Sequence, residues 1–277
     1  MDFIPHVKRV DCGLVVKYKL FEHKPDAPCI TPLTGSDGSR WYLDKTGTLY
    51  PMRVSESKGD NLDSVKRSFS RLRDIINCNA VNPAGVLFVT FTYDPNRLRS
   101  PLTLRKVSTD MANAFRRLRH DGYVFEYVYT VEQQGNGNWH SHCLFFFPGV
   151  APYLAQDYLE WVWQSGFVRV SKRFDSGDIR NVGAYVCADL TYGSGSEHGH
   201  VKDERLLSYP SGMHLYRCSR GVARPVSTDI DFSEYLADVD SLDSSPFYDV
   251  EKTLWLGSDT PRRFWFRYQH FLDTRVL

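Results

Sequence analysis

The stretch from Trp139 to Phe147 reads WHSHCLFFF, with two histidines separated by one residue and followed by an apolar run. In a β-strand, residues i and i+2 point to the same face about 6.5 Å apart, so His140 and His142 can converge on one cation. The apolar continuation predicts that the strand is anchored in a core. The pattern alone is weak, because two such histidines are more often ordinary surface or packed side chains than metal ligands.

The segment before this strand strengthens the metal-site hypothesis. Residues 125–132 form a second predicted strand, and the Gly/Asn-rich turn at residues 134–138 joins the two strands into a hairpin. A hairpin brings Glu132 close to His140. Two imidazoles and one carboxylate make a three-ligand site with open positions, suited to a divalent cation that polarises a phosphate. The alternative is that Glu132 is a solvated residue at the end of a strand.

The segments around the hairpin predict an α+β fold. The run VLFVTFTY at residues 86–93 is typical of a buried strand, and Asp94-Pro95 ends it. Ser108 is a predicted cap for a helix that ends near residues 121–122. Three other helices are expected at residues 63–78, 153–164 and 178–192, and a returning strand at residues 166–170. This order fits an antiparallel sheet covered by helices.

Two tyrosines lie seven residues apart in the last of these predicted helices. Tyr185 and Tyr192 are separated by two helical turns, so they share one face. A tyrosine hydroxyl is a poor nucleophile at its usual pKa of about 10, and it needs an electrophilic phosphate to attack. The alternative is that these tyrosines simply pack against the sheet.

Charge is distributed unevenly along the chain, although the net charge is only +1. Residues 97–119 are rich in Arg and Lys with Asp110 as the single acid, whereas residues 228–251 are acidic. A local basic patch suits a protein that meets polyanions on one face, and a solvated helix face is the alternative. No apolar run long enough for a membrane span and no secretory signal is recognisable. We therefore expect a cytoplasmic protein with no membrane partner, whose six scattered cysteines are reduced.

Several motifs in register resemble the HUH-type rolling-circle replication initiators of small single-stranded DNA phages and plasmids. The resemblance covers about residues 84–225. The matching stretches are FVTFTY at residues 88–93, AFRRLR at 114–119, VEQQG at 131–135, HSH at 140–142, VGAYV at 182–186, LYRCSRG at 215–221 and Arg224-Pro225.

This resemblance implies a five-stranded antiparallel sheet with the histidines on a central strand. It also implies a nuclease core at residues 84–225, with extensions at residues 1–83 and 226–277. The core would hold Mg²⁺ or Mn²⁺ through Glu132, His140 and His142. Tyr185 would cut single-stranded origin DNA and form a 5′-phosphotyrosine, with Tyr192 as a less favoured second nucleophile, and a host helicase and polymerase as partners. The side chains expected to contact DNA are Thr90, Thr92, Arg116, Arg117, Arg119 and Arg220.

One position departs from the family pattern. Members usually carry a lysine one helical turn after the tyrosine, and often a second tyrosine beside it, but here Ala188 and Asp189 occupy those places. Because that lysine is thought to handle the phosphate or the tyrosine proton, a module that only binds an origin or hairpin is an alternative. A relaxase or transposase with the same motif, or an unrelated metal hydrolase, also remains open.

Overall fold

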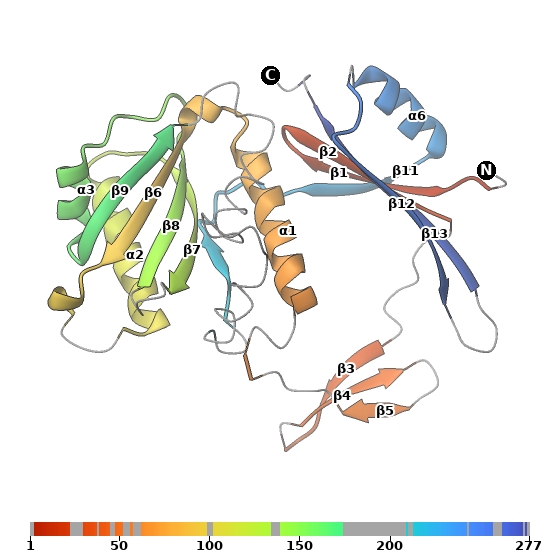
Figure 1. Cartoon of the computed structure of the whole chain (residues 1–277), viewed down its shortest axis with the longest axis horizontal. Helices are drawn as coiled ribbons and strands as arrows, with labels where there is room; N and C mark the ends of the chain where they lie inside the picture. Colours follow the sequence, from red (N-terminus) through yellow and green to blue (C-terminus); the bar gives the residue numbers. More distant parts are fainter. Residues whose placement is uncertain are drawn as a thin grey trace, which may run out of the picture.

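The computed structural model describes most of the chain. The described residues are 3–22, 30–37, 39–44, 48–51, 56–57, 62–98, 102–133, 139–173, 209, 213–242, 244–256, 262–273 and 275. Within them the chain forms three antiparallel sheets and four α-helices, which confirms the predicted α+β class (Figure 1).

The sheet that carries the two histidines has five strands in the order β10-β7-β8-β6-β9, and we call it the histidine sheet. Every neighbouring pair in it is antiparallel, and β8 with its histidines is the central strand, as predicted. The strands are β6 (Val86–Tyr93), β7 (Glu126–Gln133), β8 (Trp139–Phe146), β9 (Gly166–Arg173) and β10 (Tyr216–Cys218).

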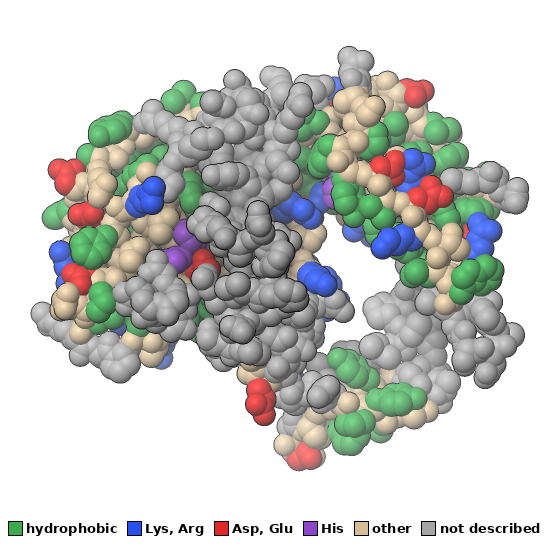
Figure 2. All heavy atoms as spheres, in the orientation of Figure 1, with side chains coloured by type: hydrophobic (Ala, Val, Ile, Leu, Met, Phe, Trp, Pro, Cys, Tyr) green, Lys and Arg blue, Asp and Glu red, His purple; other side chains and the backbone are tan. Residues whose placement is uncertain are grey.

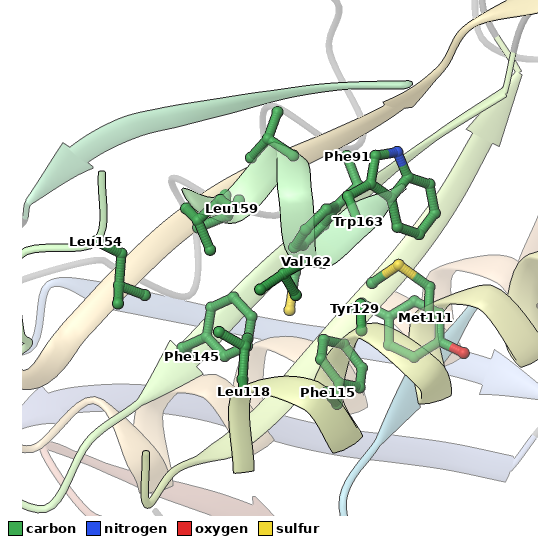
Figure 3. Packing of buried hydrophobic residues seen from close by; sticks show 14 of the residues in the cluster. Phe91, Met111, Phe115, Leu118, Tyr129, Phe145, Leu154, Leu159, Val162 and Trp163 are labelled. Atoms are coloured by element: carbon green, nitrogen blue, oxygen red, sulfur yellow. The ribbon is translucent and has the colours of Figure 1, made fainter. Parts of the chain in front are cut away.

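Helices α2 (Leu104–His120) and α3 (Gln156–Trp163) cover one face of the histidine sheet (Figures 1 and 3). The side chains between them are fully buried, with Phe145 and Leu159 both 0% exposed. The residues labelled in Figure 3 show this packing: Phe91, Met111, Phe115, Leu118, Tyr129, Phe145, Leu154, Leu159, Val162 and Trp163. Since β8 alternates, its odd-numbered side chains enter this core and its histidines face the other way.

Helix α1 (Leu62–Asn79) covers part of the opposite face. Its side chains Leu72 and Ile76 pack against Phe88 and Leu144 in a second buried cluster. Thr90 follows Phe88 by two residues on β6, and His142 precedes Leu144 by two residues on β8. The histidines therefore continue the face that α1 covers, just past the end of its apolar cluster.

A second five-stranded sheet joins strands from both ends of the described chain, in the order β11-β1-β2-β13-β12, and we call it the second sheet. Its strands are β1 (His6–Cys12), β2 (Val15–Phe21), β11 (Val226–Ile230), β12 (Tyr248–Leu256) and β13 (Arg262–Leu272). Helix α6 (Phe232–Ser241) covers one face, where Tyr235 donates a hydrogen bond to Gln269 over 2.6 Å. The expected division at residues 83 and 225 stays a prediction, but strands on both sides of it share this sheet.

The remaining elements are small. Strands β3 (Ile30–Thr34), β4 (Arg40–Asp44) and β5 (Leu49–Pro51) form a three-stranded sheet. Two single-turn helices, η1 (Pro83–Gly85) and η2 (Pro95–Arg97), flank β6.

Most predicted boundaries agree with the structure to within a few residues, but the predicted cap of α2 is wrong. The helix begins at Leu104, and the Thr103 hydroxyl accepts a hydrogen bond from the Lys106 amide over 3.2 Å. Ser108 instead lies inside the helix, where its hydroxyl donates to the Leu104 carbonyl. The predicted helix at residues 178–192 lies outside the described residues.

Two further expectations concern membranes and cysteines. Over the described residues, no helix combines the length and the apolar character that crossing a membrane requires. In the same part of the chain, Cys12, Cys78, Cys143 and Cys218 are free thiols.

Candidate metal centre

The β7–β8 hairpin builds the candidate site. Glu132 lies directly opposite His140 in the strand register, and Thr130 lies opposite His142. The prediction that the hairpin brings Glu132 and His140 together is therefore confirmed. Because alternate residues of a strand share a face, Glu132, His140 and His142 all point to the side of the sheet away from α2 and α3.

The three side chains converge on one small volume. One Glu132 oxygen, Oε2, lies 3.3 Å from His140 Nε2 and 3.4 Å from His142 Nε2. A ligand atom from each of the three residues lies within 4.8 Å of the other two. His140 is only 7% exposed, whereas Glu132 and His142 are half-buried, so the cluster reaches the surface at one side.

The electrostatics of the cluster keep the carboxylate charged. Burial alone would raise the pKa of Glu132, but hydrogen bonds and charge from His140 and His142 outweigh it and hold that pKa well below its usual range. An ionised carboxylate beside two imidazoles is a donor set for a divalent cation. Figure 2 shows histidine side chains beside an acidic one on this face of the molecule.

The neighbouring strand β6 fixes the orientation of His142. Thr90 lies opposite His142 in the register, and its hydroxyl oxygen is 3.1 Å from His142 Nδ1. The Phe88 ring stacks on the imidazole, with centroids 5.6 Å apart and planes 13° apart. These two contacts leave Nε2 of His142 facing Glu132. Partners of this kind fix the ring orientation of metal-binding histidines.

The residues present fit a divalent cation. Imidazole nitrogens and a carboxylate oxygen suit Mn²⁺ and related ions, and three protein ligands leave positions open for a phosphate. The Nδ1 atom of His140 is buried and has no hydrogen-bond partner among the described residues, which leaves Nε2 as the atom of this ring that faces Glu132. The geometry can therefore hold an ion against an anionic substrate.

Strand β9 adds two side chains that sequence reasoning did not single out. Phe167 lies opposite Thr92, and Arg169 lies opposite Thr90, so both share the face of the histidines. Phe167 is 54% exposed, and Arg169 is exposed as well. The alternation of these two residues with buried Val168 was a readable signal, but the pairing of β9 with β6 was not.

The predicted DNA-binding arginines of α2 lie on the opposite face of the histidine sheet. Arg117 donates to the Val162 carbonyl over 2.8 Å and to Gln164 over 2.7 Å, which ties α2 to the end of α3. Arg119 donates to the Phe125 carbonyl and lies 5.1 Å from the Phe125 ring centroid. Arg116 is exposed. The sheet thus separates these arginines from the metal cluster, and their contact with DNA stays a prediction.

Arg220 lies near the start of β7. It lines an open pocket of about 750 Å³ together with Arg119, Phe125 and Ser219. The Ser219 hydroxyl accepts a hydrogen bond from the Tyr127 amide, which joins this segment to the histidine sheet. The structure therefore places Arg220 near Arg119 rather than with the histidines. Tyr185, Ala188 and Tyr192 lie outside the described residues.

Comparison with known proteins agrees with a Rep-type replication initiator, the class that the motifs resemble. Residues 86–193 match the family model of the ORF2 type of replication-associated protein. This segment includes β6 to β9 and the whole Glu132, His140 and His142 cluster. The match confirms the resemblance and supports a role in the initiation of DNA replication. No curated protein and no solved structure matches the chain.

Proposed function

We propose that this protein nicks single-stranded DNA at a replication origin, remains attached to the cut strand and later rejoins it. Glu132, His140 and His142 would hold Mg²⁺ or Mn²⁺, and Tyr185 would be the nucleophile. The observation that carries the proposal is the three-residue cluster on the central strands, inside the segment that matches replication-associated proteins. The protein would act in the cytoplasm of a bacterial host.

The reaction follows from the residues. A bound divalent cation would supply charge neutralisation at the scissile phosphate. The Tyr185 hydroxyl loses its proton and its oxygen bonds to phosphorus, while the bond to the 3′-oxygen breaks and that oxygen leaves as a 3′-hydroxyl. The product is a 5′-phosphotyrosine. The free 3′-hydroxyl primes a host polymerase behind a host helicase, and rejoining reverses the step without ATP.

Side chains near the cluster suit an unpaired DNA strand. Phe167 offers an exposed ring for base stacking, and Arg169 offers a cation for the backbone. Thr92 lies between Phe167 and His140 in the register. Arg116, Arg117, Arg119 and Arg220 would contact phosphates elsewhere, with salt-dependent affinity and no sequence choice.

A gel assay for covalent adducts tests the nucleophile. Purified protein is mixed with labelled single-stranded DNA from its own replicon and Mn²⁺, and the mixture is then denatured. We expect a labelled protein band that disappears with chelator and with Tyr185→Phe, while the matched variant Tyr192→Phe still nicks. Tyr192 would count as a second nucleophile only if Tyr192→Phe nicks but fails to rejoin.

Substitution of the histidines tests the metal site. We expect His140→Ala and His142→Ala each to abolish the adduct, because each removes one ligand of the cation, while DNA binding is largely retained. Adduct formation at the wild-type rate in either variant would show that the metal assignment is wrong.

The replacement of the family lysine by Ala188 favours a second candidate function. In this alternative the protein recognises an origin or hairpin without cutting it and recruits other proteins. Binding of the DNA with no adduct and no cleavage would support it. Cleavage that leaves a free terminal phosphate and never an adduct would instead indicate a metal hydrolase that uses water. A relaxase or transposase would form the same adduct and differ in its DNA substrate.

A further inference from the structure

The second sheet leaves one face away from α6. Side chains of Trp265 and Phe271 on β13 point into the cluster that includes Tyr235 of α6, so the alternate residues Phe266 and Tyr268 point to the other side. Helix α1 contacts this other side at one end, where Lys17 pairs with Asp74. Figure 1 shows α6 and α1 on opposite sides of the sheet.

The part of this face beyond α1 carries interleaved cations and aromatic rings. Lys19 lies opposite Tyr268, and Lys252 lies opposite Phe266 in the register. Tyr248 at the edge is 43% exposed and stacks on His270 with centroids 4.6 Å apart. We call this surface the aromatic-basic patch, and its residues are Lys8, Lys19, Tyr248, Lys252, Phe266 and Tyr268.

The charges of the patch are uncompensated. Lys8 lies directly opposite Lys19, and like charges in that position destabilise a sheet. Within the described part of the chain, none of the three lysines forms an ion pair. Burial and the positive charges of Lys17 and Lys8 lower the pKa of Lys19. Figure 2 shows Lys and Arg side chains beside the hollow between the two halves of the molecule.

The rings complete the argument for one kind of partner. Phe266 and Tyr268 lie on alternate positions of β13, their centroids are 4.9 Å apart, and both are half-buried. A sheet that presents rings among unpaired cations can stack bases and neutralise phosphates, whereas a duplex keeps its bases stacked on each other. We infer that the aromatic-basic patch is a second binding surface for single-stranded DNA, separate from the histidine cluster. The choice of DNA over RNA rests on the proposed function.

Fluorescence anisotropy with the full-length protein tests this inference. The probe is a labelled oligothymidylate of roughly 16 nucleotides, the upper site size of one compact single-strand-binding fold. Chelator is present throughout, so the result does not depend on nicking. Each lost phosphate contact should weaken binding roughly fivefold at about 0.1 M salt and reduce the slope of log K against log salt by about 0.7.

We expect Lys8→Gln/Lys19→Gln to bind roughly 25-fold more weakly, with a salt slope about 1.4 smaller. The same variant should unfold at the same or a higher temperature, because it removes a like-charge pair. A merely structural role would not produce that combination. The matched control is Arg40→Gln/Arg105→Gln, which removes two exposed cations outside the patch and should keep the wild-type affinity.

A second variant tests the rings. Phe266→Leu/Tyr268→Leu keeps the apolar character and should weaken binding at least about fivefold with an unchanged salt slope. Wild-type affinity and slope in Lys8→Gln/Lys19→Gln, or an equal loss in the control, would overturn the inference. In that case the patch would meet a different partner, such as a protein. Loss of the covalent adduct with intact patch binding would contradict the proposed function alone.

Discussion

The candidate metal centre depends on single atoms. Glu132 Oε2 faces Nε2 of both histidines, and the Thr90 hydroxyl faces the remaining nitrogen of His142. The sequence predicted the three ligands, because they follow from strand alternation and one hairpin. It assigned Thr90 to DNA, since the pairing of β6 with β8 brings together segments that are not neighbours in the chain.

Substitution of Thr90 tests its role in orienting His142. We expect Thr90→Val to lower Mn²⁺ affinity about 10-fold to 100-fold, the usual effect of losing a hydrogen bond that orients a ligand. Calorimetric titration of the DNA-free protein with Mn²⁺ measures it. Thr92→Val is the matched control, because Thr92 lies on the same face of β6 opposite His140. Equal affinities in the two variants would remove the orienting role.

At the scale of elements, the basic helix α2 is a structural support for the histidine sheet. Two of its arginines are engaged with backbone carbonyls of neighbouring segments, Arg117 with Val162 and Arg119 with Phe125. Helical periodicity predicted the buried face of α2, but it could not show which cations the neighbouring segments use. The charge pattern therefore overstated how many arginines are free for DNA.

Paired substitutions on α2 separate support from binding. We expect Arg117→Met to reduce the free energy of unfolding by about 2 kcal/mol, the scale of hydrogen bonds from a charged group. Arg116→Met should change it by less than about 0.5 kcal/mol, because Arg116 is exposed. Urea unfolding followed by circular dichroism checks both values. A similar loss in the two variants would mean that the contacts of Arg117 contribute little.

At the scale of the whole molecule, α1 connects the two large sheets. Leu72 and Ile76 pack on the histidine sheet, while Asp74 pairs with Lys17 of the second sheet. The helix was predictable from its apolar spacing, but its second contact was not. The second sheet was also out of reach, since β2 pairs with β13, and local patterns carry no information about partners so distant in sequence.

The junction between α1 and the second sheet predicts a pH dependence. Burial, with the charges of Lys17, Arg73 and Lys19, lowers the pKa of His270 to about 3. An unfolded histidine titrates near 6.5, so the unfolded state binds the proton first as the pH falls. The contribution of neutral His270 to stability is thus complete above about pH 6.5 and is lost as the pH falls toward about 3.

Unfolding at two pH values checks this sign. Between about pH 7.5 and 5, the wild type should lose about 1 to 2 kcal/mol more than His270→Gln, after allowance for solvent screening of a half-buried group. Urea titrations at both pH values give the difference. Identical losses would show that His270 reaches solvent before the chain unfolds.

The pairing of β2 with β13 also has a consequence for synthesis on the ribosome. Val15 is paired with Leu272, so one of the first strands to be made waits for one of the last. Once β10 has been made, every strand of the histidine sheet is present, while β2 still lacks a neighbour and offers an open edge to other chains. A ribosome that stalls between residues 219 and 261 therefore holds a chain with a complete set of strands for one sheet and an aggregation-prone edge in the other.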